Sequence, residues 1–123
     1  MMPLNFAGAV IDVLVSDLGR AERFYTVLMG RAHDLEPRPD QREWRLCREP
    51  EVVLRLTALV ESAGHGKVAI GVHDLAEERA RLALDWPDVP EIWAKPKVIA
   101  LLELGDPDGN EVTLWQDLMG NRR

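Results

Sequence analysis

An internal repeat constrains the fold of this chain more than any other feature of its sequence. The segment Val10–Leu18 (VIDVLVSDL) aligns with Lys67–Leu75 (KVAIGVHDL), which begins 57 residues later. Each copy runs from an apolar, strand-like stretch into Asp-Leu, and aspartate is a good helix N-cap because its carboxylate accepts hydrogen bonds from the free amides of the first turn. The repeat therefore predicts two half-domains that each begin with a strand and a helix.

The apolar spacing after each Asp-Leu pair sets the extent of the two helices. After Asp17, apolar residues recur at helical spacing up to Leu28, and Gly30 suits the left-handed position that ends a helix. The helix after Asp74 must stop before Pro87, because a proline ring removes an amide donor and clashes with the preceding turn. We expect helices at about Leu18–Met29 and Leu75–Leu84.

Three strand-like segments follow each predicted helix, separated by turns that contain proline. The turn at Asp106–Asn110 (DPDGN) combines a proline, which presets φ, with a glycine, which permits a positive φ. Ser62–Gly66 is the only flexible linker, and it falls between the repeats. We therefore expect one domain over residues 1–123, with βαβββ units at about 6–61 and 66–118. The expected strands after the helices are Ala32–Leu35, Glu43–Arg48, Val52–Ala58, Glu91–Ala94, Val98–Leu104 and Glu111–Gln116.

Length, charge and cysteine content exclude several classes of protein. The 21 acidic and 15 basic residues among 123 give a net charge of −6, which repels a phosphate backbone, so no nucleic-acid partner is expected. The apolar runs are far shorter than a membrane span, and the N-terminus lacks an export signal, so no membrane contact is expected. The single cysteine, Cys47, excludes an intrachain disulfide and is expected to be buried and inert. These features favour a cytoplasmic location.

Two motifs carry a resemblance to a known family: VSDLGRAERFY at 15–25 and DPDGNEVTL at 106–114. Together with the repeat, they resemble the vicinal-oxygen-chelate superfamily of glyoxalases, bleomycin-resistance proteins and dioxygenases over nearly the whole chain. The resemblance implies an α+β fold in which two βαβββ units form curled mixed sheets, each half of a cup, with the helices outside. It also implies a homodimer, in which units from two chains face each other and share a ligand site.

The resemblance also locates the positions at which family enzymes hold a divalent metal. They map to Val10, Lys67 and Thr113, with a fourth near Arg55. Valine has no donor atom, and arginine and lysine carry a positive charge that repels a cation. No metal and no other cofactor is therefore expected. The three histidines show no ligand spacing and are interpreted as solvated residues of loops or helix starts: His33, His65 and His73.

Strand alternation predicts which residues share the cavity face, because side chains two positions apart point the same way. Asp12 is charged in an otherwise apolar strand, and a buried charge is costly without a partner. It either meets a ligand or pairs with Arg55 or Lys67 inside a filled cup, and both interpretations stay open here. Trp115 is the tryptophan that alternation places on this face. Core or interface packing is expected for the others: Trp44, Trp86 and Trp93. The predicted ligand-binding residues are Asp12, Arg55, Lys67, Glu111, Thr113 and Trp115.

Three functions remain open at this point. The first is a metal-free protein that binds a small organic ligand in a cup at a dimer interface. The second is an enzyme of lyase, isomerase or dioxygenase-like type, with displaced metal ligands, or with Asp12 or Glu111 as general base and Arg55 or Lys67 stabilising an oxyanion. The third is an interaction module whose cup is filled by side chains. The sign of the ligand's charge is also open, since Arg55 and Lys67 would attract an anion, whereas Asp12, Glu111 and Trp115 would favour a planar cation.

Overall fold

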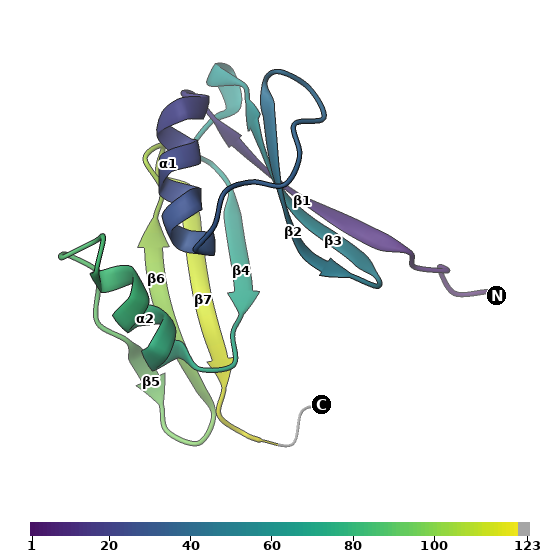
Figure 1. Cartoon of the computed structure of the whole chain (residues 1–123). Coiled ribbons are helices and arrows are strands. Elements are labelled where there is room, and N and C mark those ends of the chain that lie inside the picture. The colour runs from purple at the N-terminus through teal and green to yellow at the C-terminus, as the bar shows by residue number, and fades with distance from the viewer. Residues whose placement is uncertain (121–123) are drawn as a thin grey trace. The chain divides into compact units, whose positions relative to one another are not determined.

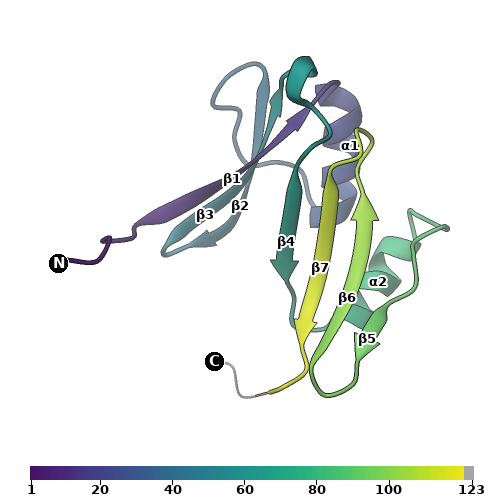
Figure 2. The ribbon, with the colours of Figure 1, turned by 180° about the vertical axis from the view of Figure 1, so that it is seen from behind.

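The computed structural model describes residues 1–120, which form two units that divide between Gly64 and His65. Each unit is an open sheet with one α-helix against it (Figures 1 and 2). Within residues 1–120, neither helix is long and apolar enough to cross a membrane.

The first unit contains three strands, one α-helix and a short 3-10 helix: β1 (Gly8–Val15), α1 (Leu18–Met29), β2 (Gln41–Arg48), β3 (Glu51–Ala58) and η1 (Val60–Ser62). The strand order is β1-β3-β2, with β1 parallel and β2 antiparallel to β3. This register places Asp12 beside Arg55.

The helix α1 confirms both of its predicted ends. The Asp17 side chain accepts a hydrogen bond from the Arg20 amide, and Gly30 adopts a left-handed φ of 73°. The helix buries Tyr25, whose ring lies 6.3 Å from that of Trp44 on β2. The alternate residues of the sheet that point to the same side form the rest of this core: Val13, Val15, Leu54 and Leu56.

The strand predicted at Ala32–Leu35 is wrong, because this segment makes only one isolated bridge, between Leu35 and Glu43. The following residues Pro37 and Pro39 have no amide hydrogen and cannot extend a ladder. The first unit is therefore βαββ with one residual bridge where the repeat predicts a further strand.

Cys47 also departs from the prediction, since it is exposed and not buried. It follows a register shift between Arg45 and Cys47, a β-bulge on an edge strand near the β2–β3 turn. A residue that follows a bulge on an edge strand is open to solvent. Membership of a strand was therefore not enough to predict that Cys47 is buried.

The second unit has the full βαβββ order: β4 (Lys67–Gly71), α2 (Leu75–Ala83), β5 (Trp93–Lys95), β6 (Ile99–Gly105) and β7 (Glu111–Asp117). The strand order is β4-β7-β6-β5, with β4 parallel to β7. As predicted, Asp74 caps α2, accepting from the Glu77 amide. β5 begins at Trp93, two residues later than expected. The buried residues of this unit include Val68, Leu75, Leu82, Leu102, Val112 and Leu114.

The DPDGN turn between β6 and β7 is held by a buried polar network. Asp106 Oδ1 accepts from the amides of Asp108 and Asn110, both at 2.9 Å, and Asn110 Nδ2 donates to Asp106 Oδ2 at 2.8 Å. Asn110 Oδ1 accepts from the Gly66 amide at 2.7 Å, just before β4. Gly109 has the positive φ, 92°, that the motif predicted. The motif therefore joins the β6–β7 turn to the start of β4.

Candidate functional site

One face of the second sheet carries its exposed side chains in three cross-strand rows. The register places Lys67 beside Glu111, and Ala69 beside Thr113, which is paired with Glu103. The third row runs across all four strands: Gly71, Trp115, Leu101 and Trp93. The opposite face carries the buried residues of the unit, such as Leu102 and Leu114.

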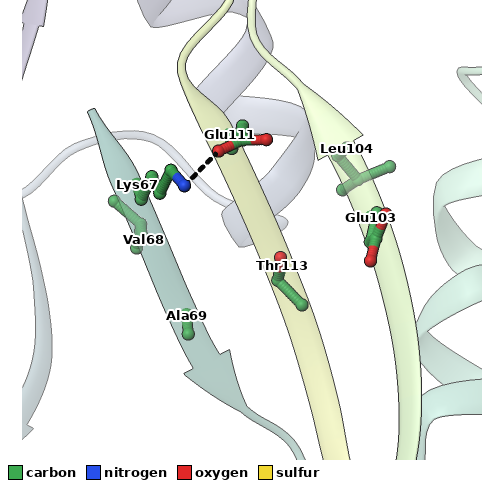
Figure 3. Close-up of a pocket in the computed structure, with 7 residues that line it drawn as sticks. All are labelled: Lys67, Val68, Ala69, Glu103, Leu104, Glu111 and Thr113. Atoms are coloured by element: carbon green, nitrogen blue, oxygen red, sulfur yellow. Dashed lines mark ion pairs between the residues drawn. The ribbon is translucent and has the colours of Figure 1, made fainter. Parts of the chain in front are cut away.

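The first two rows border a depression of about 570 Å³ (Figure 3). Lys67 Nζ lies 3.4 Å from Glu111 Oε2 at its rim, with side chains 83% and 64% exposed. The side chain of Glu103 makes no hydrogen bond or ion pair within residues 1–120. The lining residues are Lys67, Val68, Ala69, Glu103, Leu104, Glu111 and Thr113.

The third row gives this face an aromatic border. The indole of Trp115 lies so close to Gly71 that a Cβ added there would stand 2.8 Å from the ring carbon Cζ2. Trp44 is fully buried, as core packing predicts, whereas Trp93 is 58% exposed and therefore lies outside the core of this chain. The interface packing that was the other expectation for Trp93 stays a prediction. Trp93 and Glu103 also line a second depression, of about 500 Å³. Glu103 therefore belongs to both hollows of this face.

The two predicted site residues of the first unit, Asp12 and Arg55, contact each other. Arg55 Nη1 lies 3.9 Å from Asp12 Oδ2, and Arg55 Nε donates to Glu43 Oε2 at 2.6 Å. The Glu43 side chain is only 7% exposed. Thr57 Oγ1 donates to Asp12 Oδ1 at 2.8 Å and accepts from Gln41 at 3.3 Å. Asp12 therefore has Arg55 and Thr57 as partners, while its side chain is 42% exposed and not enclosed in a filled cup.

The residues at the family's metal positions do not fit a divalent cation. Arg55 and Lys67 direct positive charge toward carboxylates, and Val10 offers no donor atom. Thr113 supplies only a hydroxyl. Within residues 1–120, no group of three or more His, Cys, Asp or Glu side chains is arranged to hold a metal.

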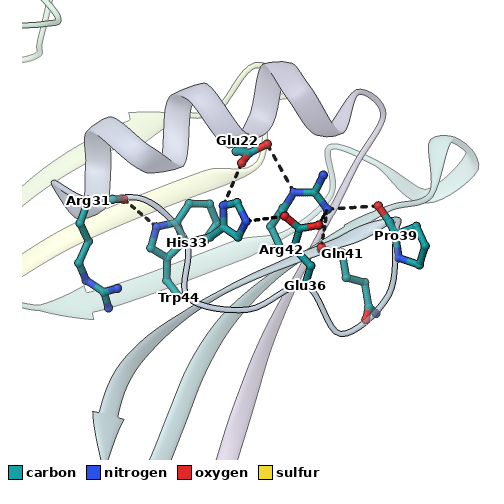
Figure 4. Close-up of polar contacts among 8 residues, drawn as sticks. All are labelled: Glu22, Arg31, His33, Glu36, Pro39, Gln41, Arg42 and Trp44. Atoms are coloured by element: carbon teal, nitrogen blue, oxygen red, sulfur yellow. Dashed lines mark hydrogen bonds and ion pairs between the residues drawn. The ribbon is translucent and has the colours of Figure 1, made fainter.

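His33 is not the solvated loop residue that the sequence suggested, because its side chain is only 19% exposed. Its Nδ1 lies 2.9 Å from Glu22 Oε1 on α1, and its Nε2 lies 2.8 Å from Glu36 Oε2 (Figure 4). The hydrogen bond from His33 holds the pKa of Glu36 below its ordinary value. Arg42 on β2 reaches the same two glutamates. This cluster pins the irregular connection between α1 and β2, which is a structural role.

Sequence reasoning missed three residues that shape these faces: Glu43, Trp93 and Glu103. Alternation along the predicted strand Val98–Leu104 could have placed Glu103, since Leu102 and Leu104 point to the core. Glu43 and Trp93 lay in predicted strands, but what their side chains meet depends on the register of the β2–β3 and β5–β6 pairs, which was not predicted.

Among the comparisons with known proteins, only the comparison of three-dimensional structures found similar proteins. No protein-family model matches the chain, and no curated protein sequence matches it. A glyoxalase/bleomycin resistance protein from Catenulispora acidiphila superposes with a TM-score of 0.81 at 22% identity, over 90% of this chain and 98% of that one. The chain has the vicinal-oxygen-chelate fold. The α+β class and the resemblance expected from the two motifs are thereby confirmed at the level of the fold.

Two further structures with this fold are similar over most of both chains. A lactoylglutathione lyase from Agrobacterium tumefaciens matches with a TM-score of 0.69 at 20% identity, over 97% of this chain and 98% of that one. The bleomycin-binding protein from Streptomyces verticillus, solved with copper(II)-bleomycin, matches with a TM-score of 0.68 at 20% identity, over 91% and 97%.

Proposed function

We propose that this protein binds a small organic molecule on the open face of its second sheet, without a metal. The observation that carries the proposal is the depression of about 570 Å³ beside a row of two tryptophans, on a face that side chains leave unfilled. Aromatic side chains combined with a few polar groups in a concave surface are typical of small-molecule sites. The bleomycin-binding protein is a precedent for a binding role on this fold.

The charges on this face favour a neutral or cationic planar ligand. Lys67 is paired with Glu111, so the free charge in the depression is the Glu103 carboxylate. In the first unit, Arg55 is likewise paired with Glu43 and Asp12. The anion-binding alternative needs a cation without a carboxylate partner, and neither predicted site offers one. The same pairing weakens the enzymatic alternative, in which Arg55 or Lys67 would stabilise an oxyanion.

A ligand screen by thermal unfolding tests this proposal. Planar aromatic monocations of the acridine class should raise Tm. Aromatic carboxylates of the same size should give no rise in Tm that depends on Lys67. Saturation at a hundredfold excess over Kd stabilises by about 2.7 kcal/mol, an easily measured shift. Glu103→Gln should weaken the binding about fivefold, the effect of roughly 1 kcal/mol expected for one exposed charge at contact distance.

The controls separate binding from general electrostatics and from metal. Glu61→Gln removes an exposed acid from the first unit and should leave the affinity unchanged. Lys67→Ala should not weaken the binding of a cation, because it frees the Glu111 carboxylate in the depression. Protein treated with EDTA should bind equally well. If carboxylates alone stabilise the protein, and Lys67→Ala abolishes that effect, the ligand is an anion and not a cation. No stabilisation by any compound would favour an interaction module instead.

The proposal includes a homodimer in which a second chain completes the site. Val10 and Trp93, 50% and 58% exposed on the sheets of the two units, are apolar side chains that a second chain would cover. Sedimentation at micromolar concentration should therefore give twice the chain mass of 13.9 kDa. A stable monomer would require the ligand site to be complete within one chain.

A further inference from the structure

A hollow on the first unit gathers positive charge in an otherwise acidic protein. It has a volume of about 450 Å³ and lies where the segment after α1 passes along β2. The whole chain carries a net charge of −6, yet three arginines line this one hollow. Its lining residues are Arg31, Asp34, Arg45, Leu46, Cys47 and Arg48.

Asp34 holds two sides of the hollow together. Its Oδ2 accepts from Arg31 Nη1 and from the Arg45 amide, both at 2.7 Å, while Arg31 Nη2 donates to the Arg45 carbonyl oxygen at 2.5 Å. The Arg31 hydrogen bond and the Arg45 amide hold the pKa of Asp34 below its ordinary value. The carboxylate is therefore engaged in positioning the Arg31 guanidinium, which keeps further N–H donors.

The remaining charges do not cancel. Arg45 Nε lies 3.3 Å from Glu51 Oε2, and the side chain of Arg48 makes no hydrogen bond or ion pair within the described residues. Three guanidinium groups thus meet two carboxylates, which leaves one excess positive charge on an exposed, unpaired arginine. The side chain of Leu46 adds an apolar contact to the same hollow.

We propose that this hollow binds the oxyanion group of a small organic phosphate, with Arg48 as the free guanidinium and Arg31 as the fixed one. A planar guanidinium matches phosphate oxygens in a bidentate geometry that a lysine cannot offer. The volume exceeds that of the phosphate group alone, so there is room for an organic portion against Leu46. This site lies in the first unit and does not depend on the function proposed for the second sheet.

The single cysteine provides a built-in reporter, because Cys47 lines the same hollow and is exposed. Its modification by the neutral reagent 2,2′-dithiodipyridine can be followed with and without inorganic pyrophosphate, with ionic strength held constant by sodium chloride. Pyrophosphate bound in the hollow should slow the reaction at least about threefold, since a thiol must be accessible to attack a disulfide. The protection should be lost in Arg48→Gln.

A matched variant and a second reagent complete the test. Arg38→Gln removes the same charge from a side chain that is 69% exposed and lies outside the hollow, and it should keep the protection. The dianionic reagent 5,5′-dithiobis(2-nitrobenzoate) should react about threefold more slowly with Arg48→Gln than with the wild type at low salt, because one nearby attractive charge is lost. The rate with the neutral reagent alone is the baseline for each variant, because it reports the reactivity of the thiol itself. The threefold loss is therefore expected in the ratio of the two reagents' rates.

Two results would overturn the proposal. One is a wild-type protein whose Cys47 is not protected by pyrophosphate. The other is equal protection in the wild type, Arg48→Gln and Arg38→Gln, which would mean a general ionic effect. The ligand screen on the second sheet depends on neither Arg48 nor Cys47, so failure here and failure of the proposed function are distinguishable.

Discussion

Trp44→Ala should lower the free energy of unfolding by about 3–5 kcal/mol, the usual cost of truncating a buried tryptophan. Trp44 is fully buried on β2 and packs near Tyr25 and His33, with ring centroids 6.3 and 5.9 Å away. Its Nε1 donates to the Arg31 carbonyl oxygen at 2.9 Å. The substitution therefore leaves a cavity and also removes the partner of that oxygen.

Urea unfolding monitored by circular dichroism measures this loss. Trp93→Ala is the matched control, because Trp93 is 58% exposed on a sheet face and its removal should change stability by less than about 1 kcal/mol in the monomer. Equal losses for the two variants would contradict the placement of Trp44 in the core and Trp93 at the surface.

Asn110→Ala should cost about 2–3 kcal/mol, the penalty for leaving buried polar partners unsatisfied. Asn110 is fully buried, and its side chain bonds both to Asp106 and to the Gly66 amide. Alanine would leave the Asp106 carboxylate and the Gly66 amide without this hydrogen-bond partner. It would also cut the link between the β6–β7 turn and the start of β4, so the loss should be shared by the whole second sheet.

Asn110→Asp gives this prediction a pH signature. The new carboxylate would face Asp106, which is 6% exposed, so repulsion would raise the pKa of the pair in the folded state. A group with a raised folded pKa contributes stability at low pH that is lost as pH rises, so this variant should be weaker relative to wild type at pH 7 than at pH 4. Asn5→Ala, at an exposed position, should be neutral. A pH-independent difference would contradict the assigned contact.

Local signals predicted most of the fold. The caps Asp17 and Asp74 bond to amides three residues away, and Gly30 needs only its own backbone freedom, so each is readable from a few neighbouring residues. The internal repeat and the DPDGN turn added the order of the units. The repeat predicted a strand at Ala32–Leu35 that the structure does not contain, and the two prolines that follow this segment cannot extend a ladder.

For the candidate site, too, local sequence patterns predicted one part and the tertiary structure decided the other. Sequence alternation by itself determined that Glu111, Thr113 and Trp115 share one face, because the two-residue period of a strand is a local property. Lys67, on another strand, was assigned to this face by the family resemblance, and the register of β4 against β7 places it beside Glu111. Only the tertiary structure decided the partners of these charges, since the register of β2 against β3 places Glu43 on Arg55. It also decided that Trp93 and Cys47 are exposed. Burial and charge pairing depend on the register and the bulges with which neighbouring strands pair, and the residue pattern of a single strand does not encode them.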